Sequence, residues 1–354
     1  MEDELNPTDT MQLDTLDQTV LKGLDFLAEV QANGKLPEFD EHEFKRPLCI
    51  GSGLSDTTLR KMYNNVDAVF ANESDYEAAY QRVKGSIDQV VILSISGGKH
   101  SPSIAEWAKG EGLHTRLLTC NPQTPVLDVV DDHVLYPSPS KHAANKSENP
   151  DCDQEPLTYN FATYTGLIMS KTGESAAAAK KWIMEVVEPI LESFEEKSGK
   201  IGQYESFFGL VPENLHLLGY RGIVKFQELF SQQYGVDFCT PEDTKHAKTV
   251  VPTLGEGEQH IDPKTGHPIQ YKKQLFMSFG FNNSTYGNEE DRLNIPFPEN
   301  ADYAAGTAII YYVIGRLQDE LPPLYKLNVA AYAQEQGRLF GSKMSILQDY
   351  HKPK

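Results

Sequence analysis

One short stretch of the sequence combines residue types that can bind an oxyanion. An apolar run at residues 90–93 is followed by Ser94, Ser96 and Gly97, a second glycine, and then Lys99. Hydroxyls donate hydrogen bonds, glycines let backbone N–H groups approach a ligand closely, and lysine adds positive charge. The pattern predicts a buried strand, a turn and a helix with a proline at its start. The positive end of that helix would complete a site for a phosphate.

A second stretch of the same kind lies upstream. The run at residues 47–50 leads into a Gly-Ser-Gly turn containing Ser52, and Ser55 follows at the start of a helical pattern. The carboxyl ends of parallel strands meet at one edge of a sheet, so we expect both turns to face one ligand. An ordinary strand–helix connection, with Ser55 as a helix cap, is the alternative. The third glycine of a dinucleotide fingerprint is missing, which argues against an NAD site.

The two turns belong to a regular alternation of strands and helices. Strand patterns lie near residues 47–50, 67–71, 89–94, 114–119 and 132–136, with amphipathic segments between them. This rhythm predicts a parallel, doubly wound sheet. A second, degenerate cycle is predicted to contain strands at 212–219, 236–239, 275–279 and 293–297 and an apolar helix at 303–317. Helical patterns at 10–34, 155–171 and 174–197 precede and separate the two cycles.

The predicted fold class is α/β, with two tandem doubly wound parallel-sheet domains of flavodoxin-like type and an N-terminal helix. A length of 354 residues fits two domains. We assign residues 1–45 to an N-terminal helical segment and 46–198 to a first domain that holds the phosphate site. Residues 199–354 form a degenerate second domain with a C-terminal tail.

Composition excludes several classes of partner. The net charge of −19 argues against nucleic acids and anionic membranes, which bind basic surfaces. No run of apolar residues is long enough to span a bilayer, and the acidic start does not look like a secretory signal. Cysteines and histidines are scattered, without the spacing of metal ligands. We therefore expect a cytoplasmic protein with reduced thiols and neither a metal nor another cofactor.

The motifs Gly53-Leu-Ser55 and Ser94-Ile-Ser-Gly97, in this order and spacing, resemble those of the sugar isomerase (SIS) domain proteins. These proteins handle phosphosugars and consist of two tandem α/β domains. The resemblance covers residues 46–320, and it implies that the serines hold the phosphate of the substrate. Lys99 stands where the family usually has a threonine, and a lysine can also bind phosphate through its charge.

The second half resembles the isomerising members, including the isomerase part of glucosamine-6-phosphate synthase. Their Lys-x-x-Glu element corresponds to Lys225-Phe-Gln-Glu228, and their Lys-His element to Lys245-His246. The resemblance implies that Glu228 moves a proton between C1 and C2 of an open-chain sugar and that His246 opens the ring. Lys225 would stabilise the developing oxyanion. A lysine and a glutamate three residues apart also form ordinary ion pairs on helix surfaces.

The resemblance thus implies a metal-independent enzyme that acts on C1–C2 of a hexose phosphate, an amino-sugar phosphate or a fructosamine phosphate. Isomerase, deaminase and deglycase reactions share this chemistry. The alternative is a non-catalytic phosphosugar sensor, because the Gly-Pro that follows the histidine in the family is Ala247-Lys248 here. We expect a homodimer, since the N-terminal helix and an apolar stretch at 324–347 exceed what two compact domains need.

Overall fold

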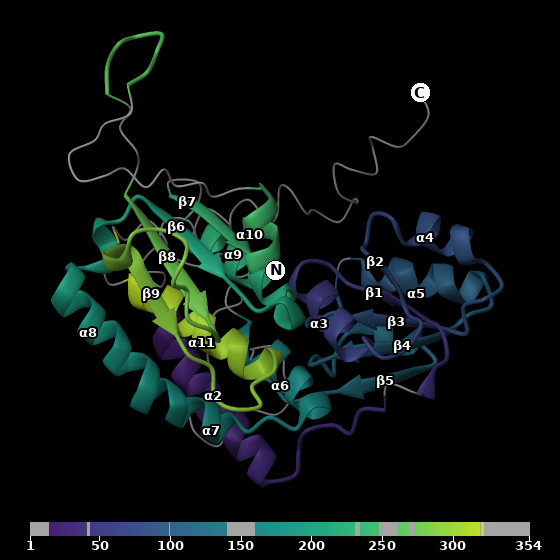
Figure 1. Cartoon of the computed structure of the whole chain (residues 1–354). Helices are drawn as coiled ribbons and strands as arrows, with labels where there is room; N and C mark the ends of the chain where they lie inside the picture. Colours follow the sequence, from purple (N-terminus) through teal and green to yellow (C-terminus); the bar gives the residue numbers. More distant parts are fainter. Residues whose placement is uncertain are drawn as a thin grey trace, which may run out of the picture.

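The computed structural model contains two parallel sheets with helices packed around them (Figure 1). The structure describes residues 14–40, 43–98, 100–139, 160–230, 234–247, 261–268, 273–318 and 320–321. Lys99 and the stretch at 324–347 lie outside these residues. Within the described part, no helix is long and apolar enough to cross a membrane.

The first sheet has five parallel strands in the order β2-β1-β3-β4-β5. This is the flavodoxin-like order, and it confirms the doubly wound sheet predicted from the sequence. The strands are β1 (Pro47–Ile50), β2 (Val69–Ala71), β3 (Gln89–Leu93), β4 (His114–Thr119) and β5 (Asp132–Leu135). Every residue of β1 and β3 is buried, because helices cover both faces of the sheet. These helices include α3 (Leu54–Met62), α4 (Tyr76–Val83) and α5 (Ser101–Gly110).

The second sheet has four parallel strands in the order β7-β6-β8-β9. They are β6 (Ser206–Leu210), β7 (Gly235–Cys239), β8 (Gln274–Phe279) and β9 (Arg292–Ile295). The order repeats that of the first sheet without its last strand. The two tandem parallel-sheet domains and the N-terminal helix expected from the sequence are therefore confirmed.

The strand predicted at residues 212–219 is wrong. Those residues form a short 3₁₀ turn (Glu213–Leu215) and the start of helix α9 (Leu217–Phe230), whereas the strand is β6. The Ser-Phe-Phe-Gly-Leu sequence of β6 is buried on both faces, and aromatic residues favour strands. The leucines after Pro212 instead open a helix that buries one side, and leucine favours helices.

The structure describes six further α-helices. They are α2 (Leu16–Ala32), α6 (Phe161–Thr172), α7 (Ala176–Trp182), α8 (Glu188–Ser198), α10 (Pro241–Ala247) and α11 (Tyr303–Gln318). Helix α2 packs against α11, α6 and α7, and all four helices contribute to the hydrophobic core that contains the second sheet (Figure 1). A Cβ atom on Gly315 of α11 would lie 2.0 Å from the backbone nitrogen of Asp17, so these helices are in close contact. The apolar face of α2 is thus covered within the chain.

A carboxylate from another part of the chain caps the N-terminus of α11. Glu174, in the link between α6 and α7, accepts hydrogen bonds from the N–H groups of Asp302, Ala304 and Ala305 at 2.9–3.0 Å. Such groups have no partner inside their own helix, and a negative charge there also suits the helix dipole. Asp302 in turn pairs with Lys61 of α3 at 2.7 Å. The contacts connect the first domain to the central helix of the second.

We expect Glu174→Ala to lower the free energy of unfolding by about 1–3 kcal/mol, because it leaves helix-terminal N–H groups without their acceptor. Urea unfolding followed by circular dichroism measures the change. Glu185→Ala is the matched control, since the Glu185 side chain is 64% exposed and its pairing with Lys181 is loose. Equal stability of the two variants would contradict this role for Glu174.

Candidate functional site

The two predicted turns lie next to each other. Strands β1 and β3 are neighbours in the sheet, with Ile50 paired to Ile92. The turn at residues 51–53 therefore leaves the carboxyl edge of the sheet beside the turn at residues 94–98. We term these two turns, together with Ser55, the cradle.

Contacts from the loop after β4 hold the β3 turn in its conformation. Gly97 has a φ of +62°, a value that favours glycine, and Thr124 Oγ1 donates to its carbonyl at 2.7 Å. A Cβ atom on Gly97 would lie 2.6 Å from Thr124 Oγ1. Asn121 Nδ2 donates to the carbonyl of Ser96 at 2.9 Å. The turn is therefore preformed rather than dependent on a ligand.

The cradle serines differ in accessibility. Ser52 is exposed, whereas Ser94 and Ser96 are half-buried at the end of β3. The hydroxyl oxygen of Ser96 accepts a hydrogen bond from the Gly98 N–H at 3.2 Å, which leaves the hydroxyl proton for another acceptor. The predicted lysine at position 99 lies outside the described residues.

Ser55 is bonded to a tyrosine that the sequence analysis did not identify. Its hydroxyl lies 2.9 Å from that of Tyr164 on α6, and both side chains are buried. Burial raises the pKa of Tyr164 to about 12, and the nearby Glu228 carboxylate acts in the same direction. The hydrogen bond to Ser55 and the Arg221 guanidinium oppose this shift. Tyr164 thus lies between the cradle and helix α9 of the second domain.

The predicted Lys225 and Glu228 form an ion pair on α9. Lys225 Nζ lies 2.6 Å from Glu228 Oε2, with the lysine side chain fully buried and the glutamate side chain 27% exposed. The ammonium group also lies 5.5 Å from the ring centre of Tyr311 on α11. An ammonium in such a place can stabilise a developing oxyanion, and a partly accessible carboxylate can accept a proton.

A second buried cation lies one turn earlier on α9. Arg221 is 1% exposed, and its Nη2 donates to Thr58 Oγ1 of α3 at 2.6 Å. Burial lowers the pKa of this guanidinium, while Tyr311 and Tyr164 act in the opposite direction. The spacing of four residues from Lys225 places both cations on one helix face. That spacing was visible in the sequence, but the partners from other helices were not.

His246 lies elsewhere. It is on α10 with its side chain 69% exposed, and its Nε2 is 2.8 Å from Glu242 Oε1 on the same helix. In the structure, the imidazole of His246 therefore pairs with the carboxylate of Glu242, and not with Lys225 or Glu228. Among the described residues, no group of three histidine, cysteine, aspartate or glutamate side chains is arranged to hold a metal ion.

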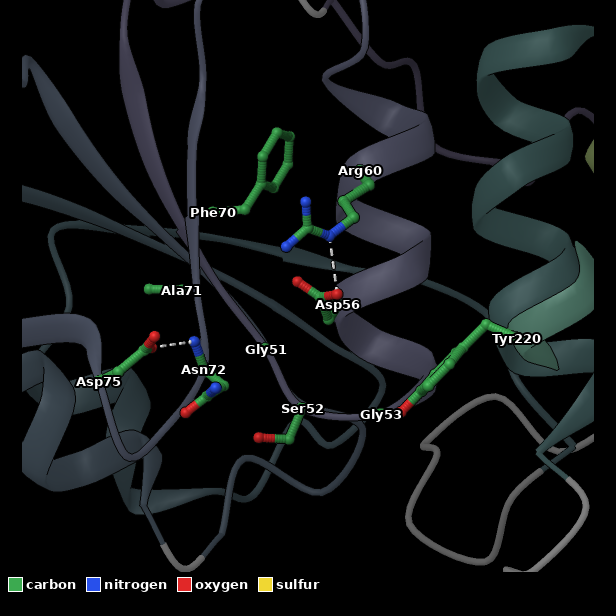
Figure 2. A pocket seen from close by; sticks show the side chains of 10 residues that line it. All are labelled: Gly51, Ser52, Gly53, Asp56, Arg60, Phe70, Ala71, Asn72, Asp75 and Tyr220. Atoms are coloured by element: carbon green, nitrogen blue, oxygen red, sulfur yellow. Dashed lines mark hydrogen bonds and ion pairs between the residues drawn. The ribbon is translucent and has the colours of Figure 1, made fainter. Parts of the chain in front are cut away.

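A cavity of about 320 Å³ adjoins the cradle on the side of β2 (Figure 2). The β1 turn forms one wall and contributes Ser52, while Ser94 and Ser96 do not line it. Tyr220 of α9 extends over Gly53, so residues of both domains border the cavity (Figure 2).

The fold is that of several sugar-phosphate enzymes. A tagatose-6-phosphate ketose/aldose isomerase from Escherichia coli matches with a TM-score of 0.53 and 10% identity, over 87% of this chain and 92% of the isomerase. A glucosamine-6-phosphate deaminase from Thermotoga maritima matches with a TM-score of 0.51 and 12% identity, over 86% of this chain and 96% of the deaminase. No family model and no curated protein matches the sequence. The chain has the tandem SIS architecture that its motifs predicted.

We expect Gly97→Ala to lower the free energy of unfolding by about 1–3 kcal/mol, because alanine is strained at positive φ and its methyl group would meet Thr124. Gly98→Ala is the matched control, since a Cβ atom there comes no closer than 3.3 Å to the Ser96 hydroxyl. Urea unfolding of both variants measures the difference. A Gly97 variant as stable as the Gly98 variant would show that the turn is not held as described.

Proposed function

We propose that this chain binds a hexose phosphate, or its amino-sugar or fructosamine derivative, and moves a proton within the C1–C2 unit. Isomerase, deaminase and deglycase reactions all begin in this way. The observation that carries the proposal is the position of Tyr164, whose hydroxyl lies 2.9 Å from that of Ser55 in the cradle and whose pKa is raised in part by the Glu228 carboxylate. This tyrosine lies between the Ser/Gly turns and the Lys–Glu pair, in a fold shared with sugar-phosphate isomerases and deaminases.

In the proposed complex, the phosphate lies at the carboxyl ends of β1 and β3. The hydroxyls of Ser52, Ser55, Ser94 and Ser96 donate to its oxygens, and Gly97 gives the turn its shape. The first turn of α5 adds the positive end of a helix dipole. Lys99 is proposed as a further phosphate ligand from its place in the sequence.

The proposed chemistry takes place beside α9. Glu228 removes the proton from C2 of the open-chain aldose and returns it to C1, while the hydroxyl proton moves from O2 to O1. The Lys225 ammonium stabilises the enediolate formed between these two steps. His246 is proposed to open the sugar ring. Its position on exposed α10 fits a role in the active site of a second copy, within the homodimer expected from the sequence.

A phosphosugar sensor remains the second candidate. The observation that favours it is that the catalytic groups are already bonded within the chain. Lys225 is fully buried against Glu228, and His246 is paired with Glu242. A protein with these contacts can bind a phosphate at the cradle without transferring a proton.

Replacing Ser94 and Ser96 together by alanine should weaken binding of glucose 6-phosphate and fructose 6-phosphate at least tenfold. Each hydroxyl removed is a donor worth about 1.5–3 kcal/mol when bonded to a charged group. Isothermal titration calorimetry measures the affinity, and circular dichroism checks the fold. Ser198→Ala, which changes an exposed hydroxyl bonded to the carbonyl of Glu290, serves as the control. Unchanged affinity in the double variant would rule out the cradle as the phosphate site.

Glu228→Gln should leave affinity for the sugar phosphate within a few-fold and abolish exchange of its C1 or C2 proton with solvent. A general base contributes about 10²–10⁴ to the rate, and glutamine keeps the shape of the side chain. Nuclear magnetic resonance in deuterated water follows the exchange, with exposed Glu192→Gln as the control. Exchange at the wild-type rate would exclude Glu228 as the base. A wild-type protein that binds the sugar phosphate without any exchange would be the sensor.

A further inference from the structure

The buried hydroxyls of Ser55 and Tyr164 share a single hydrogen bond. Ser55, in the first turn of α3, is 6% exposed, and Tyr164, in the first turn of α6, is 7% exposed. Their oxygens are 2.9 Å apart, and neither hydroxyl has another hydrogen-bond partner among the described residues. Two hydroxyls carry two protons, of which one bond uses only one. One buried proton is therefore left for a further acceptor, and buried polar groups normally have a partner.

The surroundings of Tyr164 indicate which of the two hydroxyls donates. Burial raises the pKa of Tyr164 to about 12, so the phenol keeps its proton at neutral pH. The nearby Arg221 guanidinium carries donors only and cannot accept this proton. Glu228 Oε2 is bonded to Lys225, and no hydrogen bond joins Glu228 to Tyr164 in the part of the chain that the structure describes. Tyr164 therefore donates to Ser55 Oγ, and the proton of Ser55 is the one left over.

The β1 turn fixes where Ser55 lies but leaves its hydroxyl available. The backbone N–H of Ser55 donates to the carbonyl of Ser52 at 3.1 Å, so it is already used within the turn. A Cβ atom on Gly51 would lie 2.8 Å from Ser55 Cβ, which shows that the turn packs directly against this side chain. The hydroxyl is thus the group with which Ser55 can contact a phosphate in the cradle.

Tyr164 is a rigid support for this hydroxyl. Its ring belongs to a hydrophobic cluster that includes Leu59 and Met62 of α3, and α6 packs along α3. Three residues after Ser55 on the same helix, Thr58 Oγ1 accepts a hydrogen bond from buried Arg221 at 2.6 Å. Residues three apart lie on one helix face, so α6 and α9 both hold this face of α3. The phenol oxygen therefore keeps its place whether or not a ligand is bound.

We propose that Tyr164 is a positioning residue for the phosphate: by donating to Ser55 Oγ, it directs the Ser55 proton toward a phosphate oxygen in the cradle. The inference rests on the proposed function, and it adds a residue that acts through Ser55 without touching the ligand. Hydrogen bonds in a chain polarise one another, so the bond to Ser55 also strengthens the bond from Ser55 to the phosphate.

Isothermal titration calorimetry of the full chain with inorganic phosphate and with fructose 6-phosphate tests this role. We expect Ser55→Ala to weaken both ligands at least about tenfold, because a donor to a charged group is lost. Tyr164→Phe should weaken both by about threefold to tenfold, the usual effect of one neutral hydrogen bond. In the Ser55→Ala background, Tyr164→Phe should cost less than about twofold more, because the tyrosine then has no serine to act through.

Tyr136→Phe is the matched control. Tyr136 is 3% exposed and belongs to the same hydrophobic cluster as Tyr164, but its hydroxyl has no hydrogen-bond partner among the residues that the structure describes. This change should leave the affinity for both ligands within about twofold of wild type. Circular dichroism checks the fold of every variant.

Wild-type affinity in Tyr164→Phe would overturn the inference. The same loss from Tyr164→Phe with and without Ser55 would also overturn it, because the tyrosine would then act on the fold and not through the serine. Unchanged affinity in Ser55→Ala would overturn it without any variant of Tyr164. In each of these cases a loss in the double Ser94 and Ser96 variant would leave the cradle standing. If the wild type binds neither ligand, the proposed function fails and the inference falls with it.

Discussion

The buried guanidinium of Arg221 places the strictest physical requirement on this structure. A cation removed from water is costly unless polar groups surround it, and none of its described hydrogen-bond partners is a carboxylate. Its surroundings are instead the hydroxyl of Thr58 and tyrosines that include Tyr164 and Tyr311. These groups come from α3, α6 and α11, so helices of both domains must stay close around one side chain on α9. The same arrangement holds Ser55 and Glu228 at their relative positions.

The two sheets share a strand order but contribute different chemistry. The turn after β1 is a Gly-Ser-Gly sequence, and it supplies hydroxyls and accessible backbone. The corresponding connection after β6 contains Pro212 and a 3₁₀ turn, and it leads into the helix that carries Arg221, Lys225 and Glu228. In the proposed function, the hydroxyl donors for the phosphate thus come from one copy of the repeat, and the Lys225–Glu228 pair comes from the other. The proposed reaction would therefore need both copies.

Sequence patterns predicted the first sheet well, because β1 and β3 contain apolar runs that end at turns rich in serine and glycine. They predicted the Lys225–Glu228 pair for a similar reason, since its spacing is local. The strand β6 was misplaced, because a leucine-rich helix start followed it closely. Tyr164 and Arg221 were missed because their partners, Ser55 and Thr58, lie 109 and 163 residues away. Such contacts depend on how the domains pack against each other, and this packing cannot be predicted from a short sequence motif.

The long-range contacts of helix α2 have a consequence for folding during synthesis. The N–H of Leu16 bonds to the side chain of Gln318, 302 residues later, and α2 buries its apolar face against α11. During synthesis on a ribosome, the first sheet can close as soon as β5 emerges, because its contacts lie within a short span of sequence. Helix α2 can pack against α6 and α7 earlier, but its contact with α11 forms only after α11 has been made. The part of its apolar face that α11 covers therefore stays exposed to water until that helix is complete.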